Sequence, residues 1–403
     1  MKNSKNNTFL IISLLLTLQV KAEIVGSQAI QSSNVNKKAI FISPNGKGIK
    51  CSLSEPCNIM MIDTSKEKIS VKPGDTVFFR GGIYDYSMKN LRRIYLKGGK
   101  KGKPVTYESF PGELAIFDGS KLKVTKEDTP QRKEGRFELH GNYIHVRNIE
   151  VRNMPQYGIR IFGNHNIVEG CMIHHNHLSG IEILNKKDGY SPKPTGGSFN
   201  IVRNNTVHNN SDVGLKYANY NLGGNADGIT IHSGVKNIIT HNTVYENSDD
   251  GIDTYKSMYS MVSYNLIYLN GKGKKGNANG VKLGGSNNIL GLHATAKHNI
   301  SYANKGFAFT VHGKDNNISL EYNTAYDNQK AGYAILDDTI IKHNISYLNK
   351  EGNLVWSKGR KEQNNSWQKD IKNIKFLNYN VNLKYFLKPT KNSELQNIGA
   401  YAP

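Results

Sequence analysis

The sequence predicts an all-β protein built as a right-handed parallel β-helix, a solenoid in which each coil of chain stacks on the previous one. A unit of about 22 residues recurs from about residue 142 to about residue 349. Each unit holds short segments of alternating apolar residues bounded by turn residues, and it has no room for a crossover helix. Strands of successive units can pair in parallel only if the chain coils, and right-handed connections are the usual ones.

Pairs of asparagines mark the repeat, in the form N-x-x-x-x-N with apolar residues between them. The pairs are Asn148/Asn153, Asn205/Asn210, Asn242/Asn247, Asn265/Asn270, Asn299/Asn304, Asn323/Asn328 and Asn344/Asn349, with a degenerate copy at Gly170/His175. The longer intervals contain insertions, such as residues 186–198 and 211–224. Because equal positions stack, each side-chain amide can bond its counterpart one coil along.

One domain accounts for residues 23–403. Short strand candidates at 39–43, 76–80 and 105–108 precede the repeat and form an amino-terminal cap. Residues 350–403 lose the repeat and carry Trp356 and Trp367. We expect this tail to be an irregular carboxy-terminal cap over the open end of the core.

Residues 1–22 read as a cleavable signal peptide. Lys2 and Lys5 precede an apolar run from Phe9 to Leu18, and the small residue Ala22 follows. We therefore expect a secreted protein, extracellular or periplasmic, that is monomeric and free of the membrane once the signal is cleaved.

Cysteine usage fits export. Cys51 and Cys57 lie close enough in C-S-L-S-E-P-C to form a small disulfide loop, and Cys171 reads as a buried free thiol. The formal net charge of +21 favours an acidic partner. Export argues against nucleic acid, so an acidic polysaccharide fits better.

Three consecutive repeat units carry the residues most suited to chemistry. They read N-A-D-G-I-T-I-H from Asn225, S-D-D-G-I-D-T-Y-K from Ser248 and N-G-V-K-L-G-G from Asn279. Coils stack about 4.8 Å apart, so Asp227 should lie beside Asp250, and Asp253 beside Lys282. Four aspartates would then gather: Asp227, Asp249, Asp250 and Asp253.

The ligand types favour a hard cation. The cluster offers only oxygen ligands, and calcium accepts 6 to 8 of them in mixed carboxylate geometries. Like charges this close would stay partly protonated without a compensating cation. Lys282 is then either a base beside the cation or a salt-bridge partner of Asp253, and the two roles can coexist.

This pattern resembles polysaccharide lyase family 9, the pectate lyases, whose hallmark is an Asp on one coil, D-D-x-x-D on the next and a Lys in G-x-K-x-G-G. The resemblance extends to V-K-P-G-D-T-V-F-F-R-G-G-I-Y, Val71 to Tyr84. It implies that the four aspartates bind Ca²⁺ and that Lys282 removes a proton. The implied reaction is calcium-dependent β-elimination of polygalacturonate, which gives 4,5-unsaturated oligogalacturonides.

Three alternatives stay open at this point. The lyase could act on another polyuronide, such as alginate or a glycosaminoglycan. N-A-D at Asn225 is similar to polygalacturonases, which are hydrolases on the same fold. A non-catalytic β-helix adhesin would need neither the acidic cluster nor a base.

Other polar residues near these repeats read as structural. Arg160 and Glu182 occupy equal slots on neighbouring coils and should pair. His232, Tyr255, Lys256 and Lys272 could contact a sugar, although ordinary surface roles account for each.

Overall fold

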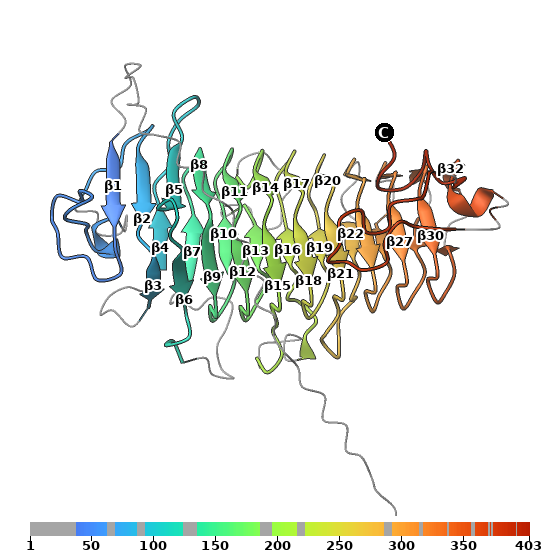
Figure 1. The fold of residues 1–403 in the computed structure, drawn as a ribbon, viewed down its shortest axis with the longest axis horizontal. Coiled ribbons are helices and arrows are strands. Elements are labelled where there is room, and N and C mark those ends of the chain that lie inside the picture. The colour runs from blue at the N-terminus through green and yellow to red at the C-terminus, as the bar shows by residue number, and fades with distance from the viewer. Residues whose placement is uncertain are drawn as a thin grey trace, which may run out of the picture. The chain divides into compact units, whose positions relative to one another are not determined.

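The computed structural model describes residues 38–62, 69–86, 93–123, 135–185, 196–215, 222–285, 292–313, 317–336, 338–355, 359–369, 371, 374–391 and 393–403. These residues form the predicted parallel β-helix (Figure 1), with three sheets whose strands pair in parallel. The described residues contain no α-helix, and their short 3₁₀ helices include η1 (Ile59–Met61) and η3 (Ser366–Gln368). None of their helices is long and apolar enough to cross a membrane.

The three sheets run along the stack of coils. The first sheet comprises β1 (Ala39–Ile42), β2 (Thr76–Phe79), β5 (Val105–Ser109), β8 (Ile144–Arg147), β11 (Ile167–Glu169), β14 (Ile201–Arg203), β17 (Ile238–Thr240), β20 (Met261–Ser263), β23 (Thr295–Lys297), β26 (Ser319–Glu321), β29 (Ile340–Lys342) and β32 (Lys361–Gln363). The second sheet comprises β3 (Gly82–Asp85), β6 (Ala115–Asp118), β9 (Ile149–Arg152), β12 (Met172–His174), β15 (Thr206–His208), β18 (Thr243–Tyr245), β21 (Leu266–Tyr268), β24 (Ile300–Tyr302), β27 (Thr324–Tyr326) and β30 (Ile345–Tyr347). The third sheet comprises β4 (Arg93–Leu96), β7 (Arg136–Leu139), β10 (Ile159–Ile161), β13 (Ile181–Ile183), β16 (Ile229–Ile231), β19 (Ile252–Thr254), β22 (Val281–Gly284), β25 (Phe309–His312), β28 (Tyr333–Ala334) and β31 (Leu354–Val355).

Alternation along each strand builds the core. In β8, for example, Ile144 and Val146 are buried while His145 and Arg147 face outward. Equal positions of successive coils are buried together, as in the stack Val168, Val202, Ile239 and Val262 of the first sheet. Packing of Ile and Val against like residues one coil along is what makes strands of only three residues stable.

Two asparagine ladders line the turns that flank the second sheet. In each, the backbone N–H and the side-chain amide of one Asn donate to Oδ1 of the next, at 2.8–3.2 Å in most rungs. The first ladder holds Asn205, Asn242, Asn265, Asn299, Asn323, Asn344 and Asn365. The second holds Asn176, Asn210, Asn247, Asn270, Asn304, Asn328 and Asn349.

The predicted assignment of the first two repeat units was one residue off. Asn148 and Asn153 have left-handed backbones, with φ of 52° and 54°, and so do Gly170 and His175. These residues occupy the bend just before each ladder position, where Asn and Gly tolerate positive φ. The ladder positions that follow the second pair of bends are Cys171 and Asn176, whose N–H groups donate to Asn205 and Asn210.

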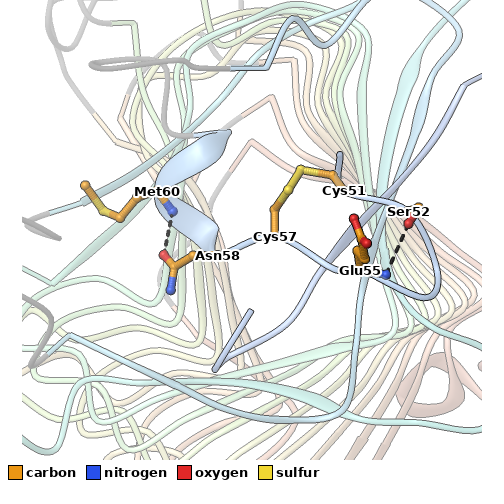
Figure 2. Close-up of a disulfide and its surroundings, with 6 residues drawn as sticks. All are labelled: Cys51, Ser52, Glu55, Cys57, Asn58 and Met60. Carbon is orange, nitrogen blue, oxygen red and sulfur yellow. Dashed lines mark hydrogen bonds between the residues drawn. A yellow bond between two sulfur atoms is a disulfide. The ribbon is translucent and has the colours of Figure 1, made fainter. Parts of the chain in front are cut away.

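The predicted disulfide between Cys51 and Cys57 is present and lies at the first coil (Figure 2). Cys57 N–H donates to the Phe41 carbonyl, and Phe41 N–H donates to the Cys51 carbonyl, so the closed loop runs alongside β1. Asn58 then caps η1 by accepting from Met60 N–H at 3.0 Å. Cys171 is buried and free, as predicted.

The carboxy-terminal tail has two parts. Trp367, on η3, packs against Tyr333 of the last coils with ring centroids 5.2 Å apart. Residues 374–403 fold back across the coils (Figure 1), where Phe376, Phe386 and Ile398 form a cluster with Ile300 and Ile345 of the second sheet. The predicted signal peptide, Trp356 and most of the 186–198 insertion lie outside the described residues.

We expect Asn270→Ala to destabilise the fold. Asn270 is fully buried, accepts from Asn247 at 3.0 and 3.2 Å, and donates to Asn304 at 3.0 Å. Alanine would remove the acceptor of the buried Asn247 N–H, which alone costs about 1–3 kcal/mol, together with the side-chain bonds to Asn247 and Asn304. Urea unfolding should show a lower midpoint, while Asn382→Ala, at an exposed position of the tail, should not. An unchanged midpoint for Asn270→Ala would contradict a structural role for the ladder.

Candidate active site

The site lies at the turns that lead into three adjacent strands of the third sheet: β16, β19 and β22. Register pairs Thr230 with Asp253, and Asp253 with Lys282, as the repeat predicted. The glycine before each strand is required by space. A Cβ on Gly251 would lie 2.3 Å from Ile267 and 2.7 Å from the Gly280 carbonyl oxygen.

Aspartate takes over the ladder role at these turns. Asp227 Oδ1 accepts from Asp250 N–H at 3.1 Å, and Asp250 Oδ1 accepts from Asn279 N–H at 2.7 Å. Asn279 continues the series by accepting from Phe307 N–H at 3.0 Å. One oxygen of Asp227 and one of Asp250 therefore accept a backbone N–H of the next coil, and the second oxygen of each remains for a ligand.

Three of the four predicted carboxylates come together. Asp227, Asp250 and Asp253 are buried, and each offers an oxygen within 4.8 Å of the others. Among the described residues, Oδ1 of Asp253 and Oδ2 of Asp250 are buried without a hydrogen-bond partner; the Asp250 oxygen has only the longer ion-pair contact with Lys282 Nζ, at 3.4 Å. Such orphaned acceptors are costly unless a cation or a proton satisfies them.

The raised pKa values of these aspartates also indicate that the cluster needs a compensating positive charge. Burial and the charges of Asp249 and Asp253 raise the pKa of Asp227 well above its usual value. Burial raises the pKa of Asp250 to about 6, against the lowering effect of Lys282. Carboxylates this close together repel one another when all are ionised, and the charge of a bound cation would offset that repulsion. Because every available ligand atom is an oxygen, a hard divalent cation fits the site.

Asp249 is directed differently from its three neighbours. Its Oδ1 accepts from the N–H groups of Asn277 and Ala278, at 2.7 and 3.1 Å, and so holds the loop that enters β22. Burial and the charge of Asp250 raise the pKa of Asp249 to about 8. Sequence could place Asp249 at the turn, but it could not show which way the side chain points, and its role as a ligand stays a prediction.

Lys282 completes the cluster. Its Nζ lies 2.6 Å from Asp253 Oδ2 and 3.4 Å from Asp250 Oδ2. Burial alone would lower the pKa of Lys282, but the charges of Asp253 and Asp250 outweigh it and raise that pKa well above the usual value. The predicted salt bridge to Asp253 is therefore present, and the ammonium is held inside the acidic cluster.

Two threonines and a histidine near Lys282 were not predicted as site residues. Thr230 and Thr310 flank Asp253 and Lys282 in register, and their buried hydroxyls have no hydrogen-bond partner in the described part of the chain. His312 ends β25, and burial together with the charge of Lys282 lowers the pKa of His312. For the two threonines, the signal available in the sequence was the slot two residues after the glycine position, which they share with Asp253 and Lys282.

The predicted Arg160–Glu182 pair is confirmed. Arg160 Nε lies 2.5 Å from Glu182 Oε2, and the Arg160 guanidinium lies 4.5 Å from the Tyr157 ring centre. His232 Nδ1 lies 3.2 Å from the other Glu182 oxygen. Although burial opposes ionisation, Arg160 and His232 lower the pKa of Glu182 to about 2. This buried ion pair flanks the acidic cluster on the amino-terminal side.

The remaining sequence candidates make ordinary contacts. Lys272 Nζ forms an ion pair with Glu246 at 3.1 Å. Lys256 Nζ lies over the Tyr255 ring, 5.0 Å from its centre.

Comparisons with known proteins show which family the chain resembles. The family model described as "Pel9A-like, right handed beta helix region" matches residues 40–364. Pectate lyase L of Paenibacillus polymyxa (strain SC2) is 26% identical over 381 residues, covering 86% of this chain and 78% of that protein. Pectate lyase L of Dickeya dadantii (strain 3937) is 28% identical over 316 residues, covering 75% of this chain and 68% of that protein.

Solved structures confirm the fold. The crystal structure of pectate lyase Pel9A superposes with a TM-score of 0.71 at 22% identity, covering 92% of this chain and 96% of that one. A rhamnogalacturonan lyase superposes with a TM-score of 0.70 at 19% identity, covering 91% of this chain and all of that one. The expected family and the right-handed helix are thus confirmed: the chain belongs to the Pel9A-like right-handed β-helix family, polysaccharide lyase family 9.

Proposed function

We propose that the protein is a secreted pectate lyase that cleaves polygalacturonate by calcium-dependent β-elimination and releases 4,5-unsaturated oligogalacturonides. The observation that carries the proposal is Lys282 Nζ at 2.6 Å from Asp253, inside a group of three buried aspartates with unsatisfied oxygens. The two pectate lyase L relatives support the substrate class.

Cation and base have separate roles in this scheme. Asp227, Asp250 and Asp253 would hold Ca²⁺, with Asp249 as the fourth predicted carboxylate. When bound, the ion neutralises the uronate carboxylate, stabilises the charge that develops beside C5, and lowers the proton affinity of nearby bases. Lys282 is the only Lys or Arg side chain that contacts these aspartates among the described ion pairs.

Lys282 acts as the general base. Its neutral amine takes the proton from C5 of one galacturonate unit, and the C–H electron pair forms the C4–C5 double bond. The C4–O bond breaks, and the oxygen leaves with the neighbouring sugar and takes up a proton. Thr310 is paired in register with Lys282 one coil along, and its buried hydroxyl, which has no hydrogen-bond partner among the described residues, is proposed to bond the Lys282 amine during the reaction.

Residues 1–22 are proposed as the signal peptide, with the mature chain acting outside the cytoplasm. The Cys51–Cys57 disulfide supports an oxidising compartment. The monomeric state stays a prediction.

The direct test is incubation with polygalacturonate while the ultraviolet absorbance of the new double bond is followed, with calcium and with chelator. Alginate and rhamnogalacturonan serve as competing substrates. New reducing ends without an absorbance rise would replace the proposal with hydrolysis, and a rise only on another uronan would replace the substrate.

Lys282→Ala should lower kcat on polygalacturonate by about 100- to 10,000-fold, the usual contribution of a positioned general base. Lys342→Ala is the matched control, because Lys342 pairs with Glu321 on the first sheet, away from the third-sheet turns. Equal activity of Lys282→Ala and native protein would exclude Lys282 as the base.

Calcium should stabilise the fold through the aspartates, independently of activity. At a free calcium concentration 100 times Kd, the free energy of unfolding should rise by about 2.7 kcal/mol. Thermal unfolding should show the rise for native protein, little or none for Asp227→Asn, and the full rise for Asp327→Asn at an exposed position. Equal shifts with magnesium would argue against a calcium site, since magnesium retains more waters.

A further inference from the structure

We propose that this protein carries a second, non-catalytic binding site for acidic oligosaccharide, in a cavity between the coils and the carboxy-terminal tail. We call it the tail cavity. Its volume is about 540 Å³, within the usual range for ligand sites. Residues that line it include His241, Tyr264, His298, Leu383, Lys384 and Tyr385.

The walls of the tail cavity leave large side chains uncovered. Leu383 is 51% exposed, Tyr264 48% and Tyr385 43%. The Tyr264 ring is stacked between His241 and His298, with centroids 5.0 and 4.8 Å away, so its faces are covered and its edge and hydroxyl stay available. Leu383 offers apolar contact and the Tyr264 hydroxyl offers a hydrogen bond, and a sugar ring, with its apolar face and several hydroxyls, can use both.

Two lysines at the tail cavity favour an acidic sugar over a neutral one. Lys384 Nζ lies 5.0 Å from the centre of the Tyr385 ring, and Lys388 Nζ lies 4.8 Å from the same centre. Lys388 Nζ also lies 5.8 Å from the centre of the Tyr401 ring, and Tyr401 lines the cavity. Among the described residues that line the tail cavity, none is Asp or Glu. Lys384 in the lining, and Lys388 against the Tyr385 and Tyr401 rings that line it, therefore complement a uronate carboxylate.

The tail cavity is built from different elements than the active site. Its lining comes from the turns between the first and second sheets, from β21 and β24, and from the tail. The acidic cluster and Lys282 belong to the third sheet. A polymer long enough to span the two sites would gain local concentration at the acidic cluster from its contact with the tail cavity. The choice of a polyuronide as the polymer rests on the proposed function.

The test measures binding without turnover. Full-length protein in chelator is titrated calorimetrically with tetragalacturonate, and with a neutral galactose oligosaccharide of equal length. We expect calcium-independent binding of the acidic ligand only, unchanged in Lys282→Ala. Lys384→Glu should weaken it by about tenfold or more because it reverses one of the two charges. Tyr264→Phe, which removes only a hydroxyl, should weaken it a few-fold.

Lys391→Glu is the control for charge alone, because Lys391 is exposed in the same tail and does not line the cavity. Equal loss in Lys384→Glu and Lys391→Glu, no loss in Lys384→Glu, or equal binding of the neutral ligand would each overturn the proposal. Activity on short oligogalacturonides in calcium separates the two hypotheses. If the protein cleaves them but Lys384→Glu binds normally, only this inference fails. If it cleaves nothing but binds through Lys384, only the proposed function fails.

Discussion

In-register stacking of coils is the constraint on which the rest of this structure depends. Strands of three residues hold together because each backbone group and each inward side chain meets its counterpart one coil along. The asparagine ladders express that constraint in side chains, since an amide can accept on one side and donate on the other. Any residue placed in a ladder slot is therefore brought beside its equivalents from neighbouring coils.

The active site uses the same constraint with charged residues. Asp227 and Asp250 accept a backbone N–H from the next coil, as a ladder Asn does, but they cannot donate. Each still offers an oxygen within 4.8 Å of the other and of Asp253, and burial and repulsion raise the pKa values of Asp227 and Asp250. The fold thus supplies the energy that holds like charges together, which is the usual balance between stability and function at a site.

The sequence predicted the position of a residue correctly where the stacking of coils alone determines that position. The pairing of Asp253 with Lys282 followed from repeat register, and so did that of Arg160 with Glu182. The register predicted from Asn148 and Asn153 was one residue off, because Asn suits both a ladder position and a left-handed bend. The orientation of Asp249 and the path of residues 374–403 depend on loop and tail packing, which has no repeat to read.

The salt bridge between Lys282 and Asp253 bears on which variants can identify the cation ligands. Removing Asp253 or Asp250 leaves a buried ammonium with less compensation, and such an uncompensated charge is strongly destabilising. If those variants lost calcium binding, the loss of a ligand could not be separated from a displacement of Lys282. Asp227 is a group member without an ion pair to Lys282 among the described contacts, and asparagine at its position keeps the oxygen that accepts from Asp250 N–H. Asp227→Asn therefore removes charge from the cation site while leaving the contacts of Lys282 in place.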